Sequence, residues 1–265
     1  SFFIITGIGH YLTSANLKVL IFRTLNRIGY FFLTLKKDHL FIFQNHDDQR
    51  LFINKKMTFS NKTVVIRGNG VDGSFFKYVD RGVPDEIVFL FSSRLLVSKG
   101  VKEFISASII LKEKYSNISF IIAGKFDPSI PETISEDLFD EICKSEKYFG
   151  EISYTKMPSV YKKASVFVLP SYGEGLPKAA LEAGLTGLPL ILTDVPGCRD
   201  CITSNKNGFL IEPRNVKDLV EKMELFIKNP SSILEKGKYS REYIQQNFNN
   251  EVIGKEYLKI LKERN

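Results

Sequence analysis

Residues 165–194 read SVFVLPSYGEGLPKAALEAGLTGLPLILTD, and this stretch alternates between two kinds of apolar pattern. The runs at 165–170 and 189–194 are short and almost continuously apolar, as is typical of strands buried on both faces. Between them, residues 177–186 are rich in Ala and Leu and begin with a proline, which favours the first turn of a helix. The stretch therefore predicts two parallel strands joined by a crossover helix.

The same alternation continues in both directions from this unit. A regular alternation of strands and helices predicts an α/β fold, with a parallel sheet covered by helices on both faces. Further strands are expected at 86–93, 118–124, 147–150 and 208–213, and further helices near 100–115, 133–145, 157–164, 216–227, 231–247 and 250–263.

The first 85 residues carry fewer elements than a closed domain needs. We expect the chain to be a fragment in which further strands of this unit would precede Ser1. The expected elements are an apolar start, a helical stretch at 15–36, a strand at 39–45, a short helix at 46–54 and a strand at 63–67.

Glycines and a proline crowd the region after this first unit, which predicts a linker between two domains. The chain is accordingly divided into a partial N-terminal domain (1–68), a linker (69–85), a C-terminal domain (86–246) and a C-terminal helix (247–265) that packs back toward the N-terminal domain.

The composition is that of a globular protein: 43% of its 265 residues are hydrophobic and 25% are charged, so disorder and coiled coil are not expected. No apolar run reaches the roughly 18 residues that a membrane-spanning helix needs. A net charge of +7 favours an anionic partner such as a nucleotide phosphate or a lipid headgroup. Nucleic acid is not expected, because no compact block of Lys and Arg with interleaved aromatic residues occurs.

Two short motifs resemble a dinucleotide-binding site and a metal or redox site, but their sequence context does not support either. Gly68, Gly70 and Gly73 spell GxGxxG after a predicted strand, but the glycine and proline that follow leave no room for the helix of a dinucleotide site. Cys198 and Cys201 form a CxxC without a second pair of ligands, so neither a zinc site nor redox chemistry is expected.

Two carboxylates accompany the helix of the opening stretch. Glu174 lies on the loop before the helix, and Glu182 lies eight positions later among Ala and Leu. The helix begins at the carboxyl edge of a parallel sheet, where anionic ligands bind. Two such carboxylates can accept hydrogen bonds from sugar hydroxyls at two places along an extended ligand. The alternative is that Glu174 is a solvated loop residue and Glu182 a surface helix residue.

Two cations follow another predicted strand, in the sequence SSRLLVSKG at 92–100. Arg94 and Lys99 lie five residues apart across a turn, so both can converge on one diphosphate, which Arg binds in a forked geometry. The alternative is that both are ordinary surface cations.

These residues match a known pattern, because residues 68–228 resemble the donor-binding domain of glycosyltransferase family 4, whose members are retaining enzymes of the GT-B fold. The opening TGIGHYLTS and FQNHDD (43–48) resemble the branch that builds capsular, exopolysaccharide and O-antigen repeat units. The resemblance rests on NGVD (69–72), SRLLVSKG (93–100), AG (123–124), VFVLPSYGEGLPKAALEA (166–183), GLPLILTDVPG (187–197) and NGFLIEP (207–213).

The resemblance implies two Rossmann-like domains, with the acceptor on the N-terminal side and the nucleotide-sugar donor on the C-terminal side. It implies that Arg94 and Lys99 clamp the donor diphosphate. Glu174 matches the residue that contacts the transferred sugar, and Glu182 matches the residue that holds the ribose hydroxyls. Glu174, Arg94 and Lys99 would then be the catalytic residues.

Backbone contacts are implied as well. Gly175, Leu176 and Pro177 match the segment whose backbone faces sugar and phosphate. Ile152 falls where the family reads the base through its backbone.

The sequence also departs from the family pattern. Ser93 replaces a usual glycine, and GKFD at 124–127 replaces a more glycine-rich form. Ile8 occupies the position where the family often places a donor-contacting His, and His10 lies close by without an assigned role.

The reaction implied is transfer of a sugar with retention, from a nucleotide sugar that the resemblance favours as a UDP-sugar, to a lipid-linked saccharide. No cofactor and no metal are expected, since the chain has no DxD motif and the resemblance implies a metal-independent enzyme. The expected location is cytoplasmic, with peripheral contact to an anionic membrane at its inner face.

Three other functions would use some of the same residues. A glycoside hydrolase would use Glu174 and Glu182 as acid and nucleophile, but the two cations would then have no purpose. A dinucleotide oxidoreductase is weakened by the failed glycine motif. The main alternative is a nucleotide-binding fragment without turnover, in which the acceptor domain is incomplete.

Overall fold

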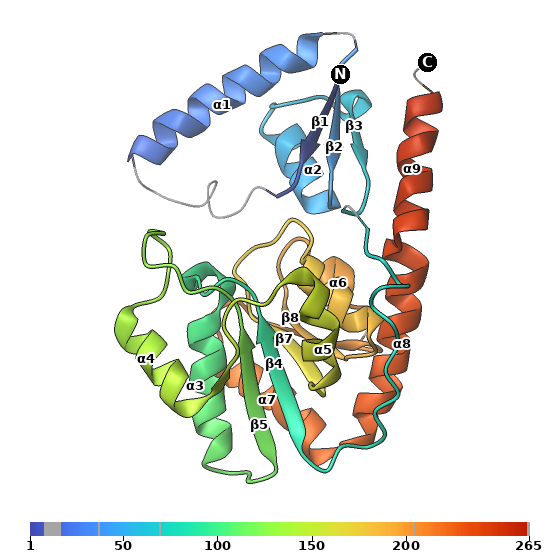
Figure 1. The fold of residues 1–265 in the computed structure, drawn as a ribbon. Coiled ribbons are helices and arrows are strands. Elements are labelled where there is room, and N and C mark those ends of the chain that lie inside the picture. Colours follow the sequence, from blue (N-terminus) through green and yellow to red (C-terminus); the bar gives the residue numbers. More distant parts are fainter. Residues whose placement is uncertain (8–16, 37, 69, 204, 264–265) are drawn as a thin grey trace.

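The computed structural model describes residues 1–7, 17–36, 38–68, 70–203 and 205–263. These residues form two parallel sheets with helices packed around them, the smaller sheet above the larger one in Figure 1. The α/β class with parallel sheets that the sequence predicts is confirmed.

The larger sheet contains six parallel strands in the order β6-β5-β4-β7-β8-β9. On one side of β4 the chain adds β5 and then β6. It then crosses to the other side of β4, where it forms β7, β8 and β9 in turn. The direction of winding therefore reverses between β4 and β7. The strands are β4 (Ile87–Ser92), β5 (Ile118–Ala123), β6 (Lys147–Tyr148), β7 (Val166–Leu169), β8 (Leu190–Thr193) and β9 (Gly208–Ile211).

Helices cover both faces of this sheet, as its continuously apolar strands require. Helix α7 begins where the sequence predicts it, since the Asn215 side chain accepts the backbone N–H of Asp218 as an N-cap. The helices are α3 (Val101–Lys112), α4 (Glu136–Ser145), α5 (Met157–Lys162), α6 (Lys178–Leu185), α7 (Val216–Lys228) and α8 (Ser231–Phe248).

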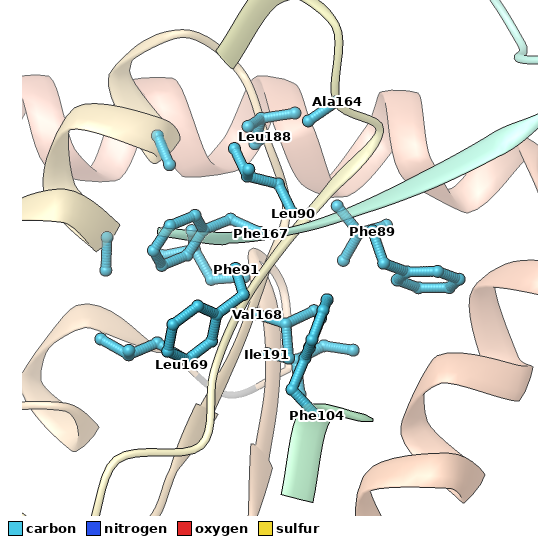
Figure 2. Close-up of a cluster of buried hydrophobic side chains, with 14 of the residues drawn as sticks. Phe89, Leu90, Phe91, Phe104, Ala164, Phe167, Val168, Leu169, Leu188 and Ile191 are labelled. Atoms are coloured by element: carbon cyan, nitrogen blue, oxygen red, sulfur yellow. The ribbon is translucent and has the colours of Figure 1, made fainter. Parts of the chain in front are cut away.

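The core of the larger domain is aromatic. Figure 2 shows labelled side chains from β4, β7, β8 and α3 gathered in one cluster. Phe89 of β4 stacks on Phe120 of β5 with 5.4 Å between ring centroids, and both are essentially inaccessible to solvent. Such burial stabilises each ring by about 2–3 kcal/mol relative to exposure and makes the sheet a rigid support for the loops at its edge.

The smaller sheet has three parallel strands in the order β1-β2-β3, where β1 is Phe2–Ile5, β2 is Leu40–Phe43 and β3 is Thr63–Val65. Helix α1 (Leu17–Leu35) joins the first two strands, and α2 (His46–Asn54) follows the second.

The C-terminal helix α9 (Asn250–Lys262) packs on this smaller sheet. Its Ile253 is buried in a cluster with Leu40, Ile42 and Ile66. In Figure 1, α8 and α9 run end to end along one side of the molecule and reach both sheets. The last two helices therefore tie the two domains together.

Residues 70–85 pack against the larger domain more closely than their glycine and proline content indicates. Phe76 is fully buried among the rings of Tyr154 and Tyr161, and the guanidinium of Arg241 donates to the carbonyl of Phe76. Arg81 donates to backbone carbonyls of the larger domain. This segment is thus fixed to the C-terminal domain, because the large side chains of Phe76 and Arg81 anchor it there.

Candidate functional site

The strand order places the candidate residues at one edge of the larger sheet. Arg94 follows β4 and Glu174 follows β7, and these two strands are neighbours at the point where the winding reverses. In open α/β sheets, ligands bind at the carboxyl ends of the strands at such a switch point. The two loops are also joined, because the backbone N–H of Tyr172 donates to the carbonyl of Ser98 over 2.8 Å.

A cleft with a volume of about 250 Å³ opens at this edge, and it brings together three of the residues predicted from the sequence: Arg94, Ile152 and Glu182. The three come from the loop after β4, the loop after β6 and helix α6. The other lining residues are Ser92, Ser93, Ala123, Gly124, Lys125, Glu151, Met157, Tyr161 and Ala179.

Glu182 is an enclosed carboxylate with a fixed orientation. It is 5% exposed, its Oε2 accepts the Tyr161 hydroxyl over 3.0 Å, and Lys178 Nζ lies 3.9 Å from its Oε1. Burial raises the pKa of the Glu182 carboxyl, and the Tyr161 hydrogen bond and Lys178 offset part of that shift. Burying a carboxylate charge lowers the stability of the folded state, and residues with such perturbed pKa values are typical of functional sites.

Lys99 and Glu174 form the second pair at this edge. Lys99 Nζ lies 2.7 Å from Glu174 Oε1, and the two side chains are 17% and 14% exposed. The structure therefore places Arg94 and Glu182 in the lining of the cleft, whereas Lys99 and Glu174 form an ion pair at the same edge of the sheet. An ammonium has three protons, so Lys99 can hold Glu174 and still donate to an anion.

The loop after Glu174 lies where the two domains meet. A Cβ added to Gly175 would come within 1.7 Å of the Thr6 carbonyl oxygen, so only glycine fits there. Leu176 packs against Gly68, and Pro177 is the N-cap of α6 with an extended backbone. The helix therefore begins at Lys178, one residue after the proline that marks it in the sequence.

Sequence reasoning missed two tyrosines at this edge of the sheet: Tyr161, which donates to Glu182, and Tyr172, which anchors the Glu174 loop through Glu103. Tyr161 is fully buried, and its burial, followed by the charge of Glu182, raises the pKa of its hydroxyl, so the group stays a donor. It lies in an apolar helix pattern, and nothing in that pattern marks its hydroxyl as functional.

Tyr172 supports the Glu174 loop in a similar way. Its hydroxyl donates to Glu103 of α3, and the guanidinium of Arg214 lies 4.5 Å from its ring centroid. Burial and the Glu103 hydrogen bond raise the pKa of Tyr172 to about 12. The neighbouring Tyr-Gly-Glu sequence gives no sign of these partners.

The remaining expectations from the sequence concern Ile8, His10, the two cysteines of the CxxC motif and membrane-spanning helices. Ile8 and His10 lie outside the described residues. Cys198 and Cys201 are buried free thiols, and within the described ranges no group of three or more His, Cys, Asp or Glu side chains could hold a metal ion. None of the helices in the described part of the chain is long and apolar enough to cross a bilayer.

Comparisons with known proteins cover most of the chain. The family model for glycosyl transferases group 1 matches residues 79–249. The chain is 29% identical over 240 residues to the N,N'-diacetylbacillosaminyl-diphospho-undecaprenol alpha-1,3-N-acetylgalactosaminyltransferase of Campylobacter jejuni, covering 86% of this chain and 61% of that protein. It is 27% identical over 184 residues to the capsular polysaccharide biosynthesis glycosyltransferase CapM of Staphylococcus aureus, covering 68% of this chain and 48% of CapM. The chain thus spans between about half and three fifths of these two relatives.

Solved structures share the fold over nearly the whole chain. Anabaena HepE in complex with UDP superposes with a TM-score of 0.84 at 19% identity, covering 99% of this chain and 72% of HepE. Sucrose-phosphate synthase from Thermosynechococcus elongatus gives a TM-score of 0.82 at 20% identity, covering 99% of this chain and 67% of that one. The fold is therefore of the GT-B type. Since the family model matches well over half of the sequence, the chain belongs to the glycosyl transferases group 1 family.

Proposed function

We propose that this protein is a retaining glycosyltransferase of family 4 that transfers a sugar from a UDP-sugar to a lipid-linked saccharide in the synthesis of a cell-surface polysaccharide. The observation that carries the proposal is the set of two cations and two enclosed carboxylates at the switch point between β4 and β7. The Campylobacter relative is named for an acceptor on undecaprenol diphosphate, CapM for capsule synthesis, and the HepE structure for bound UDP.

In the proposed reaction, the bond between the anomeric carbon and the diphosphate oxygen breaks. Positive charge develops on the sugar and negative charge on the leaving UDP. Arg94, Lys99 and the N-terminus of α6 stabilise the leaving charge at fixed positions. The acceptor hydroxyl attacks on the same face and gives its proton to the departing phosphate, so the mechanism assigns no protein nucleophile.

The remaining contacts hold the donor. Glu182 accepts the ribose hydroxyls, Glu174 contacts the transferred sugar, and the backbone of Ile152 reads the base. The backbone of Gly175, Leu176 and Pro177 faces sugar and phosphate. We propose that the reaction needs no metal, because the two cations and the helix N-terminus supply the charge that a metal would otherwise provide.

Calorimetric titration with UDP and GDP tests the donor site directly. We expect UDP to bind more tightly than GDP. Glu182→Gln and Arg94→Ala should each weaken UDP binding about tenfold, because each removes one charged hydrogen-bonding partner. Glu224→Gln is the matched control, since its 16% exposed side chain pairs with lysines far from the cleft.

The same Glu182→Gln variant should unfold at a higher temperature than wild type at pH 8, since it removes a buried charge. The native pKa of Glu182 is raised, so lowering the pH protonates the carboxyl in the folded state first, and the difference in unfolding temperature between the variant and wild type should shrink.

If neither Glu182→Gln nor Arg94→Ala weakens UDP binding, the cleft is not the nucleotide site. UDP binding without sugar transfer would instead support a nucleotide-binding protein without turnover.

The proposed acceptor lies in a membrane, so we also propose a cytoplasmic protein that docks at the inner leaflet. The net charge of +7 supports attraction to anionic lipids. Flotation with vesicles containing phosphatidylglycerol should therefore decrease as salt rises from 50 to 500 mM, since screening weakens the attraction. Flotation that does not respond to salt would contradict an electrostatic attachment.

A further inference from the structure

We propose that Asn45 is a positioning residue that holds the loop carrying Glu174 from the opposite domain. Asn45 lies at the carboxyl end of β2 in the smaller sheet, whereas the loop follows β7 in the larger one. The inference rests on the proposed function, because it concerns the loop of the same site.

Both N–H groups of the Asn45 amide donate a hydrogen bond, and its oxygen accepts one. Its Oδ1 accepts the backbone N–H of Asp48 over 2.7 Å, which caps α2. Its Nδ2 donates to Asp48 Oδ2 over 3.0 Å and to the carbonyl oxygen of Gly175 over 2.9 Å. Asn45 as a whole is 1% exposed. Since Oδ1 faces a backbone donor, the amide cannot be flipped, and Nδ2 must face Gly175.

The backbone at Gly175 is enclosed from both domains. Thr6 of the smaller domain blocks any side chain at Gly175, as described above. On the other side, a Cβ at Gly197 would lie 2.3 Å from the Gly175 carbonyl oxygen and 2.6 Å from that of Glu174. Gly197 also has a φ of +78°, where a side chain would be strained. The loop is therefore held between two backbones.

Two polar contacts then fix the loop in this space. Lys99 of the larger domain holds the Glu174 carboxylate, and Asn45 of the smaller domain holds the next carbonyl along the chain. The Asn45 contact exists only when the two domains meet as they do here. It therefore makes the position of the Glu174 loop depend on the arrangement of the domains.

A second bond between the domains lies beside it. Arg199 Nη1 forms an ion pair with Asp47 Oδ2 of α2 over 2.7 Å, but the side chains of Asp47 and Arg199 are 25% and 44% exposed. Ion pairs this exposed contribute little in water. The buried Asn45 amide is thus the more specific of the two contacts.

The test must separate this role from helix capping. Asn45→Ser keeps a good N-cap and removes both Nδ2 hydrogen bonds. Asn215→Ser is the matched control, since Asn215 caps α7 with the same spacing to an aspartate and its Nδ2 contacts Glu212 within its own domain. Far-UV circular dichroism and thermal melting establish that both variants fold.

Hydrogen exchange of the peptide 172–177 is the first measurement, made without ligand. We expect exchange to be about tenfold faster in Asn45→Ser than in wild type, and unchanged in Asn215→Ser. Equal exchange in the two variants would overturn the proposal.

Turnover is the second measurement, with UDP-glucose and UDP-N-acetylgalactosamine as probes and UDP release as the signal. We expect kcat to fall about tenfold in Asn45→Ser while UDP affinity stays within twofold of wild type. Faster exchange with unchanged turnover would overturn the positioning role. Failure of the wild-type protein to bind or release UDP would count against the proposed function, whereas the exchange measurement would still decide whether Asn45 holds the loop.

Discussion

Replacing Arg81 by methionine should lower the free energy of unfolding by about 3–5 kcal/mol, the loss typical when one partner of a buried polar network is removed. The Arg81 guanidinium donates to four backbone carbonyls, at 2.7–3.0 Å, and has no carboxylate partner among the described contacts. Burial lowers its pKa to about 10, so it is still charged at neutral pH. Without it, the carbonyls of Val79, Tyr161, Ala164 and Thr186 would lose a donor.

Urea denaturation followed by circular dichroism measures this loss. Arg50→Met is the matched control, because the Arg50 side chain is 69% exposed and forms a surface pair with Asp47, so its loss should cost less than about 1 kcal/mol. An Arg81→Met variant within 1 kcal/mol of wild type would show that water can replace the guanidinium at these carbonyls.

Replacing Lys99 by methionine should lower kcat by about a hundred- to a thousandfold, which is the usual effect of removing one charged contact to a developing negative charge. In the proposed reaction the diphosphate of the bound donor is already anionic, and one further negative charge develops on it as the sugar departs. Lys99 would therefore stabilise the transition state more than the bound donor, and UDP affinity should fall much less than kcat.

Single-turnover measurements with a UDP-sugar that the wild type uses separate these effects. Lys228→Met is the control, since Lys228 is an exposed lysine on α7 that pairs with Glu224. A kcat within threefold of wild type for Lys99→Met would mean that Lys99 serves only to hold Glu174, to which it is bonded over 2.7 Å.

The secondary structure of the larger domain was predictable because each strand is a short apolar run and each helix has its own pattern. The predicted strand at 189–194 corresponds to β8 (Leu190–Thr193), and the predicted helix at 177–186 to α6 (Lys178–Leu185). The strand predicted at 147–150 contains only the two residues of β6, which lies at one edge of the sheet and pairs with β5 alone. Local sequence does not reveal how many neighbours a strand has.

The sequence also marks the four charged candidates, because each lies just after a predicted strand or on the helix that follows one. Their grouping into an Arg94–Glu182 cleft and a Lys99–Glu174 ion pair is visible only in three dimensions. The hydrogen bond from the Tyr161 hydroxyl to Glu182, 21 residues later in the chain, is likewise visible only in three dimensions.

By itself, the sequence determined which segments form strands and helices and which charges lie at their carboxyl ends, since both depend on neighbours within one or two turns. Only the tertiary structure decided that β7 returns to lie beside β4, and that Asn45 reaches a carbonyl 130 residues away. Strand order and contacts between domains depend on how whole elements pack against one another. A periodic pattern records that a face is buried, but not which other face buries it.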